Sequence, residues 1–229
     1  MKISGFGRIQ GGRIDEDIII SGSSHINGDL ECNAIHMSGS FLGTGALITH
    51  GDIKSSGKFR IDGGLHVDKD INFSGSATVG NGVIAQGTLK TSGSFRANNK
   101  VIVSLGFIST GSSTIKGDLV SDKVISLDGS ARIYGDIKAE DVLIDTKYQW
   151  SLKKIFSAKK HPYRIRGSIH AKNKVEISRT VVNNDLKGRE VKIGERSNIE
   201  GTVYYVDNLD VHKRAFLRNK PIKIKLEEL

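Results

Sequence analysis

Apolar residues recur in pairs two positions apart over most of the chain, and successive pairs follow one another about every six residues. A pair two positions apart is typical of a short strand with one face turned inward. Three such strands, separated by corners, make a unit of about 18 residues. The strongest apolar position of this unit is occupied by Ile18, Ile35, Ile53, Ile71, Leu89, Phe107, Ile125 and Leu143.

Glycine marks the corners of the same unit. Glycine occupies the first corner position of successive units, at intervals of 17, 17 and then 18 residues throughout. These glycines are Gly5, Gly22, Gly39, Gly57, Gly75, Gly93, Gly111 and Gly129. Six residues after each of these stands another glycine, except at Asn81 and Asn99. Asparagine is the residue after glycine that best tolerates left-handed geometry, so this second corner is predicted to require a positive φ.

These repeats predict an all-β fold, a triangular β-helix (β-solenoid) of about ten coils of about 18 residues each. A single coil cannot bury its own inward face. Coils stacked about 4.8 Å apart pair their backbone groups and align like side chains in ladders. Periodicity alone does not fix the handedness of the helix. An antiparallel β-sandwich with regular turns is the alternative, which the near-constant spacing disfavours.

The repeat divides the chain into three parts. Residues 1–145 are predicted to form regular coils. Residues 146–163 are predicted to be a basic, aromatic insertion that is a short helix or a loop. Residues 164–229 are predicted to form irregular basic coils that end in a capping strand near 221–226. Residues 1–146 contain 14 Lys and Arg against 16 Asp and Glu, a net charge of −2, whereas residues 147–229 contain 20 against 9, a net charge of +11. This asymmetry suggests an anionic partner for the C-terminal part.

Several stretches of the repeat resemble the bactofilins, the polymer-forming cytoskeletal proteins of bacteria and some archaea. The resemblance covers about residues 2–145 well and 165–211 loosely. It is carried by Ser-Gly-Ser-Ser-His-Ile-Asn-Gly-Asp-Leu-Glu-Cys at 21–32, Gly-Asp-Leu at 117–119, Asp-Gly-Ser-Ala-Arg-Ile-Tyr-Gly-Asp-Ile-Lys-Ala at 128–139, and Lys-Ile-Ser-Gly-Phe-Gly-Arg-Ile-Gln-Gly-Gly at 2–12. It implies a right-handed triangular β-helix, filaments assembled end to end without nucleotide, and frequent membrane association. The family has no catalytic residues to carry over.

Self-assembly through the terminal coils is therefore the expected function, and the chain itself is the expected partner. The expected contact residues are apolar or aromatic positions of the outermost coils. They are Ile3, Ile9 and Ile14 at the start, and Val203, Tyr205, Leu209, Val211, Ile222 and Ile224 at the end. Because the N-terminus has no apolar signal core and no run approaches about 18 apolar residues, we expect a cytoplasmic protein. The resemblance adds a location at the inner face of the membrane to this expectation.

The insertion is the expected docking segment for an anionic membrane surface or a partner protein. If it is helical, apolar and aromatic side chains share one face and lysines lie beside them, which suits an anionic bilayer. The residues concerned are Trp150, Leu152, Lys153, Lys154, Ile155, Phe156, Lys159 and Lys160. The alternative is a lateral helix that covers part of the solenoid. Nucleic acid is the less favoured partner, because no nucleic-acid-binding module is recognisable.

The search for chemistry predicts no catalytic, cofactor or metal site. An 18-residue period also equals three hexapeptides, the unit of left-handed β-helix acyltransferases, so an acyltransferase or another β-helix enzyme is the competing function. Such a transferase needs a histidine general base, for which only His161 and His170 are plausible. Asp118 and Asp136 stack at one corner and are interpreted as turn formers. Cys32, the single cysteine, occupies an inward position, which indicates a buried thiol.

Overall fold

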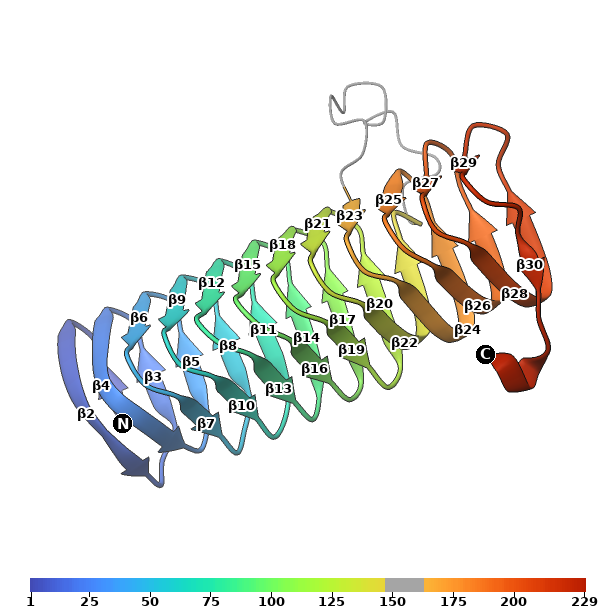
Figure 1. The fold of residues 1–229 in the computed structure, drawn as a ribbon. Helices are drawn as coiled ribbons and strands as arrows, with labels where there is room; N and C mark the ends of the chain where they lie inside the picture. The colour runs from blue at the N-terminus through green and yellow to red at the C-terminus, as the bar shows by residue number, and fades with distance from the viewer. Residues whose placement is uncertain (147–162) are drawn as a thin grey trace.

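The protein is an elongated parallel β-solenoid of about eleven turns, seen in a computed structural model that describes residues 1–146 and 163–229 (Figure 1). The strands form one 30-stranded sheet that winds around a closed interior. Each turn contributes one short strand to each of three faces, and each strand pairs in parallel with the strands one turn before and after it. The predicted all-β solenoid of about 18-residue coils is confirmed.

The three faces are ladders of stacked strands. Face 1 contains β1 (Lys2–Ile3), β3 (Ile18–Ile20), β5 (Ile35–Met37), β8 (Ile53–Ser55), β11 (Ile71–Phe73), β14 (Thr88–Thr91), β17 (Gly106–Ser109) and β20 (Val124–Leu127). Face 2 contains β6 (Ser40–Gly43), β9 (Lys58–Ile61), β12 (Ser76–Val79), β15 (Ser94–Ala97), β18 (Ser112–Ile115), β21 (Ser130–Ile133), β23 (Tyr163–Ile165), β25 (Thr180–Val182), β27 (Asn198–Ile199) and β29 (Phe216–Leu217). Face 3 contains β7 (Leu47–Thr49), β10 (Leu65–Val67), β13 (Val83–Ala85), β16 (Val101–Val103), β19 (Leu119–Ser121) and β30 (Ile222–Lys223).

Longer strands bend around a corner and belong to two faces. Faces 2 and 3 share β2 (Phe6–Ile14) and β4 (Ser23–Cys32), and faces 3 and 1 share β22 (Ile137–Ile144), β24 (Ile169–Ile177), β26 (Leu186–Ile193) and β28 (Val203–Val211). A 3₁₀ helix, η2 (Leu226–Glu228), follows β30 at the C-terminus. The predicted capping strand near 221–226 is thus limited to Ile222–Lys223, which forms the last rung of face 3 by pairing with β28.

The interior is built from the predicted ladders of aliphatic and aromatic side chains. Phenylalanines of faces 1 and 2 stack along it, with ring centroids 5.0 Å apart for Phe41 and Phe59 and 5.1 Å apart for Phe59 and Phe73. One predicted member is wrong. Ile125 pairs with Val142, which is fully buried, while Leu143 pairs with Ser126 and is only partly buried. The step from Ile125 to Val142 is 17 residues, so the inward position falls one residue earlier than an 18-residue step places it.

The corner glycines are required by close stacking of the chain rather than by backbone handedness. A Cβ atom added to Gly57 would lie 1.8 Å from the carbonyl oxygen of Gly39 in the preceding coil. The predicted positive φ at the second corner is wrong for most coils. In that set only Gly28 has one, at 88°, and neither Asn81 nor Asn99 does. These two asparagines instead hydrogen-bond to each other between coils, with 3.0 Å from Nδ2 of Asn99 to Oδ1 of Asn81.

Corner aspartates bind the coils together, a role beyond that of the turn formers predicted from the sequence. Oδ1 of Asp118 accepts the backbone N–H of Asp136 in the next coil at 2.8 Å. Oδ1 of Asp136 accepts the backbone N–H of Ser168 at the same distance. Each carboxylate thus satisfies a backbone donor of the following coil, which a corner leaves without a strand partner.

The insertion interrupts the corner between faces 1 and 2, after β22 and before β23 (Figure 1). Residues 147–162 lie outside the described part of the chain. The predicted docking residues fall in that range, namely Trp150, Leu152, Lys153, Lys154, Ile155, Phe156, Lys159 and Lys160. Their helical or loop form therefore stays a prediction.

Candidate assembly surfaces

The N-terminal end of the rod is an open edge of parallel strands. β1 pairs with β3, and β2 pairs with β4, so the outer side of both strands has no neighbour among the described residues. Ile3, Ile9 and Ile14 are partly buried there and pack against the core. Phe6 stands 70% exposed at the same end. An uncovered edge of this kind is a template for pairing with another chain.

The C-terminal end is open as well, and its last rung is formed by the end of β28 with β29 and β30. Tyr205 and Leu209 are partly buried against the core, whereas Val211 is 37% and Ile222 is 46% exposed. Ile224 follows β30, is partly buried, and donates its N–H to the carbonyl of Tyr205 at 2.9 Å.

Two residues at this end differ from the sequence-based assignment. Val203 is 1% exposed, because the chain of the final turn lies over its strand, so it is not available for contact between copies. Phe216 is 58% exposed on β29 and was missed, because the irregular coils give it no clear position in the repeat.

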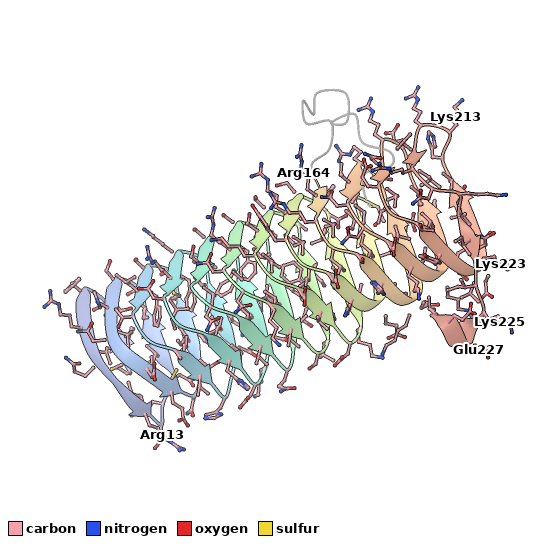
Figure 2. All side chains as sticks on the ribbon, in the orientation of Figure 1. Arg13, Arg164, Lys213, Lys223, Lys225 and Glu227 are labelled. Carbon is pink, nitrogen blue, oxygen red and sulfur yellow. The ribbon has the colours of Figure 1, made fainter. Side chains whose placement is uncertain are left out.

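Proline and lysine protect one side of the last rung. Pro221 has no N–H to offer at the start of β30, and Lys223 follows two residues later. Both devices blunt exposed strand edges. Lys223 and Lys225 point away from the rod at this end, together with Glu227 (Figure 2). The edges of faces 1 and 2 are therefore better suited to pairing than the edge of face 3.

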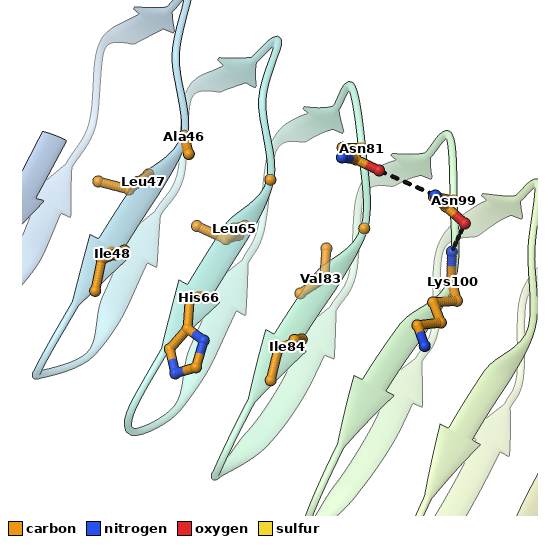
Figure 3. A pocket seen from close by; sticks show the side chains of 12 residues that line it. Ala46, Leu47, Ile48, Leu65, His66, Asn81, Val83, Ile84, Asn99 and Lys100 are labelled. Atoms are coloured by element: carbon orange, nitrogen blue, oxygen red, sulfur yellow. Dashed lines mark hydrogen bonds between the residues drawn. The ribbon is translucent and has the colours of Figure 1, made fainter. Parts of the chain in front are cut away.

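Face 3 carries a shallow hollow of about 350 Å³ on the side wall of the rod (Figure 3). It is lined by face-3 strands and the corners before them. The outward residues of successive rungs here are Ile48, His66 and Ile84. Ile48 and Ile84 are each 40% exposed. The next two outward residues, Ile102 and Val120, extend this apolar column beyond the hollow.

A cluster of acidic and basic side chains lies at the N-terminal end of this column. His50 bridges two coils, with Nε2 3.0 Å from Oε1 of Glu31 and Nδ1 2.7 Å from Oδ2 of Asp68. The hydrogen bond to Glu31, followed by the one to Asp68, raises the pKa of His50. The hydrogen bond with His50 lowers the pKa of Asp68. Arg13 lies 3.5 Å from Glu31. This cluster was not predicted from the sequence, because its members come from different coils.

The C-terminal end of the column is basic. After Val120 the outward ladder of face 3 continues through Lys138, His170 and Lys187. Burial is the main cause that lowers the pKa of His170, which favours its neutral form. Lys187 donates to the backbone carbonyl of Glu228 at 2.7 Å and so holds the C-terminal tail on face 3.

A buried ion pair lies at the base of the insertion. Arg179 donates to both carboxylate oxygens of Asp145, at 2.5 and 2.8 Å, and the side chain of Asp145 is fully buried. Both residues have a positive φ, 50° for Arg179 and 60° for Asp145. The hydrogen bond to Asp145 raises the pKa of Arg179. This pair joins successive coils where the corner glycines have ended, and it too was missed from the sequence.

The groups considered for chemistry are placed as follows. Cys32 is 1% exposed, and burial raises the pKa of its thiol to about 12, which confirms the buried-thiol interpretation. His161 lies outside the described residues, and His170 is half-buried on face 3. In residues 1–146 and 163–229, no group of three or more His, Cys, Asp or Glu is arranged to hold a metal ion. Nor does any helix within these two ranges have the length and apolarity to cross a bilayer.

Comparisons with protein-family models, with curated proteins and with solved structures find no match to this chain. The β-solenoid fold therefore stands on the structure and the repeat alone.

Proposed function

We propose that this protein is a non-enzymatic, bactofilin-like scaffold that assembles end to end through its terminal coils without nucleotide. The observation that carries the proposal is that both ends of the rod have uncovered strand edges and exposed apolar side chains. Both are open edges of parallel strands, and five of the eleven exposed large hydrophobic side chains of the described residues lie in the first or last turn. They are Met1, Phe6, Val211, Phe216 and Ile222.

The register of the ladders supports head-to-tail contact. One inward ladder of face 1 begins at Ile3, which pairs with Ile20, and ends at Val211, which pairs with Ile193. A second rod that continues this register places Val211 of one copy against Ile3 of the next. The neighbouring outward residues, Asp210 and Lys2, then carry opposite charges.

On face 2 as well, the first and last rungs of the inward ladder are both apolar. Its inward ladder starts at Ile9, which pairs with Ile26, and ends at Leu217, which pairs with Ile199. Continuing the register places Leu217 against Ile9, an apolar pair that would lose its exposed area to the junction. Burial of apolar surface contributes about 25 cal/mol per Å². A head-to-tail junction thus repeats the packing found between coils within the rod.

Docking on an anionic membrane surface, at the inner face of the membrane in a cytoplasmic setting, is the second part of the proposal. It is supported by the charge of the C-terminal part and by the lysines and aromatic residues of 147–162. Sedimentation with anionic liposomes compares the wild type with the Trp150→Ala/Phe156→Ala variant. Weaker pelleting of the variant is expected, and equal pelleting would refute docking through this segment.

Electron microscopy of the purified chain without nucleotide tests end-to-end assembly, together with light scattering. The wild type is expected to form filaments, and Val211→Asp is expected to abolish them, because the new charge faces Ile3 across the junction. Leu105→Asp is the matched control, since Leu105 is 55% exposed on the side of the rod. A wild type that stays a monodisperse monomer across salt concentrations would refute the proposal, as would filaments of Val211→Asp that equal those of the control.

A further inference from the structure

We infer that face 3 binds face 3 of a second copy of this chain, with the two rods side by side and antiparallel and a two-fold axis at Ile84. This contact lies on the side wall and goes beyond end-to-end assembly. It would join two strings of rods laterally, whether or not the ends associate.

The outward side chains of face 3 differ from those of the other faces. The central outward residues of face 3 form a column in which every residue except His66 is apolar, namely Ile48, His66, Ile84, Ile102 and Val120. The matching outward ladder of face 2 is polar, namely Arg60, Thr78, Arg96, Thr114 and Arg132. The matching ladder of face 1 is Lys54, Asn72, Lys90, Ile108 and Ser126, in which Ile108 alone is apolar. An apolar column on only one wall of a rod is typical of an interaction surface.

The charged residues at the two ends of the column favour a second copy of this chain as the partner, in the antiparallel orientation. The residue before the apolar column is Glu31 and the residue after it is Lys138. In an antiparallel pair centred on Ile84, Glu31 of each rod meets Lys138 of the other, Ile48 meets Val120, and His66 meets Ile102. In a parallel pair each residue would meet its own copy, so that Glu31 faces Glu31 and Lys138 faces Lys138. Like charges placed together across an interface are unfavourable.

The charge of the whole rod favours the same direction. Residues 1–70 contain 7 Lys and Arg against 9 Asp and Glu, a net charge of −2. Residues 163–229 contain 15 against 9, a net charge of +6. Parallel rods bring the two basic C-terminal parts side by side, whereas antiparallel rods centred on Ile84 keep these parts at opposite ends of the pair.

The C-terminal tail limits the overlap of the two rods. Lys187 anchors Glu228, and Leu229 lines a hollow on face 3 together with Lys138 and His170. With the axis at Ile84, the first turn of the partner, at Arg13, lies level with His170. The first turn of the partner therefore lies next to the tail, which helps to fix the register.

The lateral contact of one pair is expected to be weak. The apolar column spans four steps between coils, about 19 Å at 4.8 Å per step. A standard interface buries about 800 Å² on each partner, which a strip of this length does not reach alone. Many copies in register along a filament would add their contacts and make lateral pairing stable.

Crosslinking with a short bis-maleimide distinguishes the orientations. Cys32 is buried, so an introduced cysteine is the reactive one. Ile84→Cys lies on the axis and is expected to give covalent dimers. Ile48→Cys alone is expected to give none, because its copy lies about four coils, or 19 Å, away. The Ile48→Cys/Val120→Cys double variant is expected to crosslink. Dimers from Ile48→Cys alone, or no dimers from Ile84→Cys, would overturn the inference.

A charge exchange tests the pairing of Glu31 with Lys138. Glu31→Lys and Lys138→Glu each place two like-charge contacts in the dimer, and each is expected to weaken dimerisation about tenfold at low salt. The double variant restores opposite charges and is expected to dimerise nearly as the wild type does. Because Glu31 also contacts His50 and Arg13, thermal unfolding of each variant checks that the fold is intact. A double variant as weak as the single ones would contradict the antiparallel register.

The same measurements separate this inference from end-to-end assembly. Val211→Asp changes only the end of the rod, so it is expected to lose filaments while the Ile84→Cys crosslink still forms between single rods, with a lower yield and at a higher protein concentration. Ile84→Asp changes only the side wall, so it is expected to leave single filaments that do not associate laterally. Lateral association that survives Ile84→Asp would refute the role of face 3.

Discussion

Substitution of one corner glycine by alanine tests the close stacking of the coils. In Gly57→Ala the new methyl carbon would lie 1.8 Å from the carbonyl oxygen of Gly39 and 2.7 Å from that of Ser38. Ordinary contacts of this kind begin near 3.4 Å, so the two coils must move apart by more than 1 Å at this corner. The displaced carbonyl of Gly39 also accepts the N–H of Lys58 at 2.9 Å.

The expected cost combines two effects. Overpacking of a filled site costs about 1–3 kcal/mol. Weakening of one backbone hydrogen bond adds about 1 kcal/mol. The total of about 2–4 kcal/mol corresponds to a fall in melting temperature of roughly 5–15 °C for a chain of this size. Circular dichroism during heating measures this fall.

The chain provides a matched control in the same ladder. Gly5 occupies the equivalent corner of the first coil, and a Cβ atom added there meets nothing within 4 Å, because no coil precedes it. Gly5→Ala is therefore expected to leave the melting temperature nearly unchanged. Equal effects of Gly57→Ala and Gly5→Ala would refute the argument that contact between coils, rather than corner geometry, selects glycine.

Three further substitutions test the polar contacts between coils. His50→Gln removes an imidazole whose pKa is raised in the folded state. The stabilisation that His50 contributes is complete below its pKa in the unfolded chain, about 6.5. It is lost as the pH rises through its pKa in the folded protein. The difference in denaturation midpoint between wild type and variant should thus be larger near pH 5.5 than near pH 9, and a constant difference would contradict this. Arg179→Met leaves Asp145 buried without its partner and should lower the free energy of unfolding by about 3–5 kcal/mol, whereas Arg179→Met/Asp145→Leu should recover most of this loss. Asp136→Ala removes the acceptor of the Ser168 N–H and should cost about 1–3 kcal/mol in urea denaturation, compared with little for the exposed Asp122→Ala.

The fold was predictable because a solenoid repeats one local rule. Ile53 and Ile71 stand one coil apart in the sequence, and they pair directly in the structure. Wherever the coil length varies, the rule loses its register, as it does at Val142 and Leu143. The sequence identified the corner glycines but not the reason for them, because a Cβ contact with the preceding coil depends on how closely the coils stack.

The side-chain clusters were less predictable than the ladders. Glu31, His50 and Asp68 come from three coils and meet only because outward side chains at a corner reach along the rod. No spacing in the sequence distinguishes them from other exposed charged residues. Asp145 and Arg179 are separated by the insertion, which hides their proximity. Terminal residues were assigned by position alone, so Val203 was included although the last turn covers it.

The most direct measurement of end-to-end assembly is the axial repeat of filaments formed without nucleotide, determined by electron microscopy. About eleven turns at 4.8 Å predict a repeat of roughly 50–58 Å, with the spacing between coils continued across each junction. A rod that remains single at every protein and salt concentration, or a filament whose repeat does not match the length of one rod, would contradict assembly through the terminal coils.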